Sequence, residues 1–291
     1  MIPKSNLLTG ILLTVAAGTI LAGMDALGKH LTTLLPVLQV LWGRYVVQTA
    51  IIGGYLASTS GPSFLKTRHP VLQLLRGLCL LSASFLMYQA LVKVPLADAT
   101  AVLFFNPIVV TILSVLFLKE AIGIHRVAAV VAGFVGMLMI IRPGFSTIEP
   151  RLFLVLGASV LLATYLLLTR HLAGREDVAS TQFNTTAVGA VLLSFLVIPG
   201  WQPIDAGTLA LLGVFGAAGA AGHFALVRGF AYAPASMLSP FLYVQVLAAA
   251  IFSLLVFGDP LQPTMLAGTA ILVASGIYIW WREQRPRPPL A

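Results

Sequence analysis

Polar side chains are scarce in the long apolar runs of this chain, and those present there can do chemistry only with each other or with a solute. Asn106 and Pro107 lie centrally in the run 97–118, and Gln245 lies centrally in the run 236–257. Polar groups in lipid are costly, so they face a partner or a cavity. Pro107 removes a backbone hydrogen bond and so predicts a hinge with freed carbonyls. An interhelical hydrogen bond, worth about 0.6 kcal/mol, is the alternative role of each amide.

His223 is the histidine that lies well inside an apolar run, after a stretch rich in glycine and alanine. A neutral imidazole there could hydrogen-bond a carboxylate or an amine of a solute, and an imidazolium could act as a switch. The alternative is a packing histidine. Small residues before it allow close approach of helix backbones, and equally leave room for a ligand.

Arg44 lies in the second apolar run beside Trp42, and Asp25 lies at a similar depth in the first run. Two explanations are open for the arginine. It forms a neutralising ion pair with Asp25, or its guanidinium binds an anionic group such as a carboxylate. Tyr88, Tyr165 and Tyr243 also fall inside apolar runs, and a cavity lined by aromatic rings suits amphipathic solutes.

Other kinds of chemistry have no sequence signal. The chain has no Gly-x-x-x-x-Gly-Lys-Ser/Thr loop, no His-Glu-x-x-His pair and one cysteine, Cys79. We therefore expect no nucleotide hydrolysis, no metal, no cofactor and no catalytic residues. We also expect no carboxylate near mid-membrane, because Asp25 and Asp98 lie near the ends of their runs.

The composition indicates that lipid is the solvent of this chain. Of 291 residues, 59% are hydrophobic and 9% are charged, whereas a soluble domain carries about 25% charged residues. Most of the Lys and Arg residues behind the net charge of +8 lie between the apolar runs. This distribution is typical of membrane topology and argues against nucleic acid as a partner.

A bilayer core of about 30 Å requires roughly 20 apolar residues per helix. Ten runs fit: 6–28, 37–57, 71–91, 97–118, 125–141, 152–169, 181–199, 207–229, 236–257 and 264–281. The connections are short, and the proline-rich residues 285–291 are expected to be a disordered tail. The sequence thus predicts an all-α integral membrane protein of ten transmembrane helices.

The positive charges predict the orientation. With a cytoplasmic N-terminus, twelve Lys and Arg residues lie on the inner side: Lys4, Lys66, Arg68, Arg76, Lys119, Arg126, Arg170, Arg175, Arg228, Arg282, Arg285 and Arg287. Four lie outside: Lys29, Lys93, Arg142 and Arg151. Cytoplasmic loops carry the excess of Lys and Arg, so both termini are expected to be cytoplasmic.

The two halves of the chain resemble each other at an offset of 139 residues. Val94-Pro95-Leu96-Ala97 falls on Ala233-Pro234-Ala235-Ser236, and Asn106 falls on Gln245. We expect five-helix repeats at 1–144 and 151–284. Because five is odd, the second copy enters the membrane from the opposite face, which gives the inverted repeats typical of secondary transporters. Chance similarity of apolar runs is the alternative.

The motif residues of both halves resemble a known family. They are Val94-Pro95-Leu96-Ala97-Asp98-Ala99-Thr100-Ala101, Phe117-Leu118-Lys119-Glu120, Ile140-Ile141-Arg142-Pro143-Gly144, and Tyr232-Ala233-Pro234-Ala235 through Phe257-Gly258-Asp259. The chain is similar over its whole length to the drug/metabolite transporter superfamily, EamA type, and most similar to YddG-type aromatic amino acid exporters. The second copy departs from the pattern at Gly258-Asp259-Pro260, where a glutamate is typical.

The resemblance implies a multi-pass protein of the bacterial inner (plasma) membrane. We expect export or facilitated diffusion of amino acids, aromatic or other neutral ones, and of similar small metabolites by alternating access. The substrate-binding candidates are Asn106, Gln245, His223, Tyr88, Tyr165, Tyr243, Trp42 and Arg44, with Pro107 as the hinge. The alternatives are a carrier of a nucleoside or sugar derivative, an intramembrane enzyme acting on lipid, and an assembly protein. The exact substrate, proton coupling and oligomeric state are left open.

Overall fold

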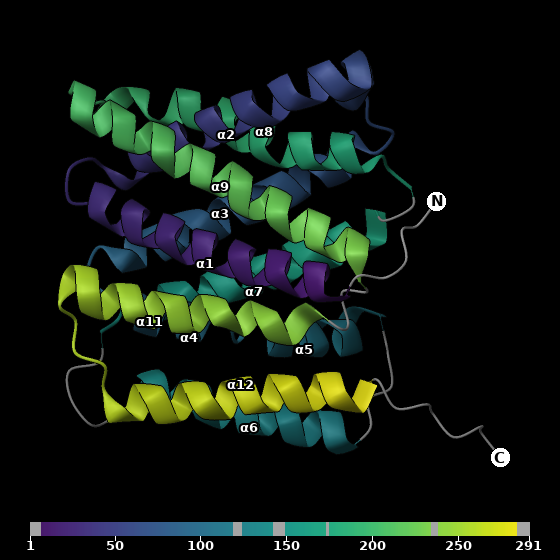
Figure 1. Ribbon diagram of the computed structural model, residues 1–291, viewed down its shortest axis with the longest axis vertical. Coiled ribbons are helices and arrows are strands. Elements are labelled where there is room, and N and C mark those ends of the chain that lie inside the picture. Colours follow the sequence, from purple (N-terminus) through teal and green to yellow (C-terminus); the bar gives the residue numbers. More distant parts are fainter. Residues whose placement is uncertain (1–6, 119–123, 142–148, 173–174, 234–237, 284–291) are drawn as a thin grey trace.

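The computed structural model describes residues 7–118, 124–141, 149–172, 175–233 and 238–283, and these are almost entirely helical (Figure 1). The α-helices are α1 (Leu7–Leu31), α2 (Val37–Ser60), α3 (Pro70–Leu91), α4 (Leu96–Leu103), α5 (Asn106–Leu118), α6 (Ile124–Ile141), α7 (Leu152–Leu172), α8 (Val178–Leu196), α9 (Ala206–Tyr232), α11 (Val244–Phe257) and α12 (Pro263–Glu283). Short 3-10 helices are η1 (Gly61–Leu65), η2 (Ile198–Gly200) and η3 (Ser239–Tyr243). The expected tail 285–291 lies outside the described residues.

Local chemistry sets several helix ends. The Asp177 carboxylate accepts the backbone N–H of Ser180 at 3.1 Å and caps α8. Asp205 does the same for α9, accepting from Gly207 at 2.8 Å and Thr208 at 3.0 Å. Such caps satisfy N–H groups that have no partner within the helix. Helix α11 ends at Gly258, whose φ of 67° is the left-handed conformation that glycine adopts most readily.

The packing pairs repeat when the halves of the chain are exchanged. Helix α1 packs against α9, and α3 packs against α7. Helix α2 contacts α8 and α9, and α8 in turn contacts α3. Helix α4 packs against α11, and α6 against α12, which lie side by side at one edge of the bundle (Figure 1). Each half therefore buries its helices largely against the other half.

Two helices are interrupted at positions 139 residues apart. The expected span 97–118 is not one helix: α4 ends at Leu103 and α5 begins at Asn106. The expected span 236–257 contains η3, which gives way to α11 at Val244. Pro107 in the first turn of α5 cannot donate the backbone hydrogen bond that would continue α4. The two interruptions place Asn106 and Gln245 in first turns of new helices.

Six described segments are long and apolar enough to cross a bilayer: Leu7–Leu31, Pro70–Leu91, Leu96–Leu113, Leu152–Leu172, Ala206–Tyr232 and Pro240–Phe257. Val127–Ile141 and Pro263–Tyr278 are shorter apolar segments. Helices α2 and α8 are not among these because they carry many polar side chains, and they pack together. Large apolar side chains such as Leu255 (76% exposed) face outward, as in a protein surrounded by lipid.

Candidate functional site

A group of polar side chains meets inside the bundle, and we call Asp25, Arg44, Tyr45, Ser84, Tyr88 and Gln245 the central polar cluster. Asp25 on α1 is 7% exposed. Its carboxylate accepts the Tyr88 hydroxyl at 2.9 Å and the Gln245 amide N–H at 3.4 Å. The cluster therefore joins α1, α3 and α11, with a carboxylate at the level of the Gln245 amide.

Arg44 on α2 is the cation of the cluster and is 8% exposed. One terminal nitrogen donates to the Ser84 hydroxyl at 2.8 Å, and Nε has no hydrogen-bond partner in the described ranges of the chain. The guanidinium lies over the Tyr45 ring at 4.7 Å, the Tyr88 ring at 5.8 Å and the Phe215 ring at 5.9 Å. Aromatic faces stabilise a cation but accept few hydrogen bonds, so this guanidinium retains donor capacity.

Asp25 and Arg44 do not form an ion pair within 4.0 Å, so the structure does not contain the pair weighed for them from the sequence. Tyr88 lies between the two, with its hydroxyl on Asp25 and its ring beside the guanidinium. The Tyr88 ring rests against Gly28, where a Cβ would overlap it. The close approach of α1 and α3 at this glycine thus holds two opposite charges apart.

The predicted polar residues of the interrupted helices lie in different surroundings. Gln245 joins the central polar cluster, whereas Asn106 Oδ1 is buried and no described residue forms a hydrogen bond with it. His223 on α9 is partly buried, and its Nδ1 also lacks a hydrogen-bond partner among the residues placed by the structure. Unpartnered polar atoms inside a protein are unusual and point to a missing ligand or water.

The aromatic residues at the two interruptions contact each other. Phe104 and Tyr243 have ring centroids 5.5 Å apart, and they occupy equivalent positions of the two halves. The Tyr243 hydroxyl fits against Gly276 on α12, where any side chain would collide with it. Pro107 follows this contact by three residues, so the proposed hinge lies directly beside it.

Tyr165 lies apart from the central polar cluster. Its hydroxyl accepts an Arg76 N–H at 3.1 Å, and the guanidinium lies 4.8 Å from its ring. Arg76 also donates to Thr169 at 2.6 Å and to the Thr181 carbonyl at 2.8 Å. This buried arginine therefore ties α3 to α7 and α8, and Tyr165 belongs to that connection.

Trp42 also lies away from the cluster, at the packing of α2 on α8. Its Nε1 donates to Ser194 at 3.1 Å, and its ring meets Trp201 edge-on at 5.1 Å. Ser194 and Trp201 are both exposed. Of the predicted residues, the structure brings together Arg44, Tyr88 and Gln245, and leaves Trp42 and Tyr165 in other contacts.

An ion pair joins the two halves at the end of the bundle where α1 ends. Lys29 Nζ lies 3.3 Å from Asp259 and donates to the Val94 carbonyl at 2.9 Å. Ser253 donates to the same Asp259 oxygen at 3.0 Å, and its own hydroxyl accepts the Ala97 N–H at 3.3 Å. This network closes the space between α1, α4 and α11 at that end.

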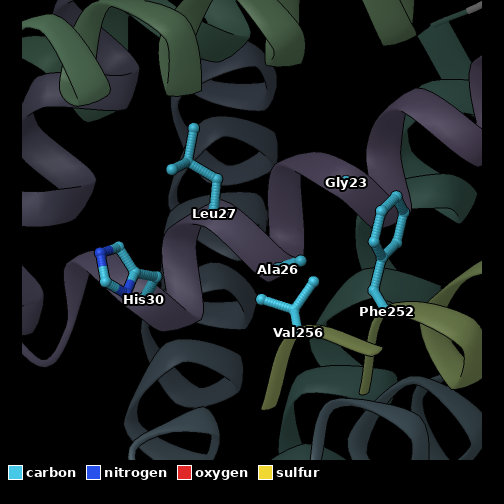
Figure 2. Close-up of a pocket in the computed structure, with 6 residues that line it drawn as sticks. All are labelled: Gly23, Ala26, Leu27, His30, Phe252 and Val256. Atoms are coloured by element: carbon cyan, nitrogen blue, oxygen red, sulfur yellow. The ribbon is translucent and has the colours of Figure 1, made fainter. Parts of the chain in front are cut away.

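A shallow pocket lies between α1 and α11. It has a volume of about 370 Å³ and is lined by Gly23, Ala26, Leu27, His30, Phe252 and Val256 (Figure 2). Figure 2 shows His30 at one end and Phe252 at the other. Because its lining is mainly apolar, the pocket itself presents little polar chemistry.

Sequence reasoning missed three members of the cluster: Asp25 as a site residue, Tyr45 and Ser84. Asp25 was expected near the membrane surface, but the structure places it against Gln245. The structure thus places a carboxylate at the level of the Gln245 amide, a contact that the sequence did not predict. The signal that could have found Asp25 is a single carboxylate in α1, placed after a long apolar stretch and before the basic last turn at Lys29 and His30.

Comparison with known proteins identifies the family. The model of the EamA-like transporter family matches twice, at residues 8–142 and 150–281. The chain also superposes on a crystal structure of another protein with a TM-score of 0.64 at 17% identity, covering 97% of this chain and 100% of that one. At this identity the likeness shows the fold alone.

Curated relatives are transporters of different solutes. An S-adenosylmethionine uptake transporter of Rickettsia felis is 26% identical, over 90% of this chain and 88% of the relative. A riboflavin transporter of Vibrio cholerae is 26% identical, over 98% and 97%. The pseudopaline exporter CntI of Pseudomonas aeruginosa is 26% identical, over 93% and 95%. These names support transport across a membrane but not the aromatic amino acid export that the sequence suggested.

Proposed function

Because the chain belongs to the EamA-like transporter family, we propose that it is a secondary carrier of small zwitterionic solutes. These are amino acids and larger molecules that contain an amino-acid head, and they bind at the central polar cluster. S-adenosylmethionine, the solute named for four relatives, carries such a head. The proposal thus keeps the amino acid chemistry and widens the range of solutes beyond aromatic amino acids.

One observation carries this proposal: two opposite charges are buried together without pairing. Asp25 can accept hydrogen bonds from an α-ammonium group, and Arg44, with its unpartnered Nε, can bind an α-carboxylate. Burial of unpaired charges is costly, so selection for packing alone would have replaced or paired them. A zwitterion placed between them completes both ion pairs.

Alternating access is the proposed mechanism. Two features support it, namely the packing pairs that exchange with the halves and the interruptions beside Asn106 and Gln245. Helix breaks at the midplane of inverted repeats form the sites of many secondary transporters. We propose that ten spans, with both termini cytoplasmic, let one repeat rock against the other in the bacterial plasma membrane.

The test is binding and uptake by purified protein in liposomes. We would compare labelled L-methionine, L-phenylalanine and S-adenosylmethionine for wild type, Asp25→Asn and Arg44→Gln. Each variant removes one charge; Asp25→Asn keeps the side-chain size, and Arg44→Gln replaces the guanidinium with a shorter neutral amide. A hydrogen bond to a charged group contributes about 1.5–3 kcal/mol, so affinity should fall roughly tenfold or more.

Two further measurements make the result decisive. 3-Methylthiopropylamine is methionine without its carboxylate, and it should bind wild type more weakly than methionine does. Arg44→Gln should bind the two molecules with similar affinity. Exposed Arg68→Gln is the matched control and should behave as wild type. If the zwitterions neither bind nor move while riboflavin does, the zwitterion proposal is rejected and a flavin carrier is favoured.

A further inference from the structure

A second set of polar groups lies next to the central polar cluster, one helical turn along α2 and α9. Gln48 follows Arg44 by four residues on α2, so it lies on the same face about 5–6 Å away. On the facing helix α9, Phe215 contacts the Arg44 guanidinium, and Gly219 follows one turn later. Gln48 on α2 and Gly219 on α9 thus each lie one helical turn beyond the contact of Arg44 with Phe215.

Gln48 is a buried amide without a partner. It is 3% exposed, and in the part of the chain that the structure describes no hydrogen bond reaches its side chain. Its Oε1 lies 3.1 Å from the point where a Cβ on Gly219 would stand, and Met24 Sδ lies 3.3 Å from the same point. The absence of a side chain at Gly219 therefore lets the Gln48 amide pack directly against α9, where a larger residue would crowd it.

His223 continues the same face of α9, four residues after Gly219. Its Nδ1 is buried and has no hydrogen-bond partner among the residues that the structure describes. An amide and an imidazole offer both donors and acceptors without a fixed charge. Within the described part of the chain neither group has a hydrogen-bond partner, although buried polar groups are normally paired.

We propose that Gln48, Gly219 and His223 form a second subsite, which binds an uncharged nitrogen heterocycle of the solute. This inference rests on the proposed function, since the amino-acid head would occupy Asp25 and Arg44. The heterocycle would lie one to two helical turns from that head, about 5–11 Å away. The preferred solute is then a two-part molecule, such as an amino acid joined to a nucleobase-like ring, rather than a free amino acid.

Equilibrium binding to purified protein tests the subsite with two probes. L-methionine carries only the head, whereas S-adenosylmethionine carries the head and an adenine ring. Wild type should bind the second probe at least tenfold more tightly. Gln48→Leu and His223→Phe should each reduce that ratio by roughly fivefold to tenfold, the value of one hydrogen bond, without weakening methionine.

Gly219→Ala adds a methyl group beside Gln48 and should reduce the same ratio while leaving the Gln48 amide in place. The matched controls are exposed Gln262→Leu and exposed His30→Phe, which should leave the ratio unchanged. Equal weakening of both probes by the subsite variants, or a wild-type ratio near one, overturns the subsite while the carrier proposal stands. Loss of binding in Asp25→Asn tests the site for the amino-acid head, and it is therefore independent of the test of the second subsite.

Discussion

Phe104 and Tyr243 pack ring against ring with centroids 5.5 Å apart, although 139 residues separate them in the chain. Each stands at the interruption of its helix, and each is the counterpart of the other in the two halves. If a pseudo-two-fold axis relates the two halves, equivalent residues contact each other close to that axis. The contact therefore lies where relative motion of the proposed repeats would be centred.

The hinge role of Pro107 predicts a loss of turnover without a loss of affinity. In Pro107→Ala, a donor N–H returns and α4 can continue into α5, which stiffens the interruption. We expect the uptake rate in liposomes to fall severalfold while Kd for the solute changes less than twofold. Pro263→Ala, at the first position of the uninterrupted helix α12, is the control. Unchanged turnover in Pro107→Ala would contradict the hinge.

The Lys29–Asp259 pair should couple the two halves. Because both side chains are mostly buried, we expect a coupling of about 1 kcal/mol between Lys29→Met and Asp259→Asn in a double-mutant cycle of thermal unfolding. The coupling should shrink at high salt. Lys93→Met, an exposed neighbour, should show no coupling to Asp259→Asn. Strict additivity of the Lys29 and Asp259 variants would show that the pair does not hold this end together.

Arg76 should act in stability rather than in solute binding. Arg76→Met leaves several partly buried partners without their donor, and we expect the free energy of unfolding to fall by about 3 kcal/mol. Tyr165→Phe removes one hydrogen bond of that set and should cost about 1 kcal/mol. Solute affinity should be unchanged in Tyr165→Phe. A weaker affinity with unchanged stability would instead return Tyr165 to the binding site.

Glu176 should make the free energy of unfolding fall at acidic pH. Burial by itself would raise the pKa of the Glu176 carboxyl, but hydrogen bonds from His69, Thr67 and the backbone N–H of Arg68 hold the pKa below its ordinary value of 4.5. A lowered pKa in the folded state means that this stabilisation is complete above about pH 4.5 and is lost as pH falls through the folded pKa.

Glu176→Gln tests this pH dependence through thermal unfolding between pH 7 and pH 3. The variant should be less stable than wild type at pH 7, and the difference should narrow below pH 4.5. Glu149→Gln, a matched change at the start of α7, should track wild type across the range. A gap between Glu176→Gln and wild type that stays constant with pH would exclude the carboxylate as its source.

The sequence by itself determined the class of protein, because composition reports the solvent directly. A chain with few charges and long apolar runs is stable in lipid when the runs form helices, because each helix satisfies its own backbone hydrogen bonds. The family motifs near Val94 and Ala233 are also local, and the family comparison confirmed what they predicted. The hydrogen-bonding role of Gln245 was partly visible for the same reason, since an amide in an apolar run needs a partner.

The tertiary structure alone decided which polar groups meet. Asp25 and Gln245 lie 220 residues apart, and only the packing of α1 on α11 brings them to 3.4 Å. In the same way, the packing of α3 against α7 and α8 brings Arg76 within hydrogen-bonding distance of the Tyr165 hydroxyl. Hydropathy fixes how deep a residue lies only within a few residues, and it does not fix the direction in which a side chain points. That direction depends on the rotation of each helix about its axis, which is set by its neighbours.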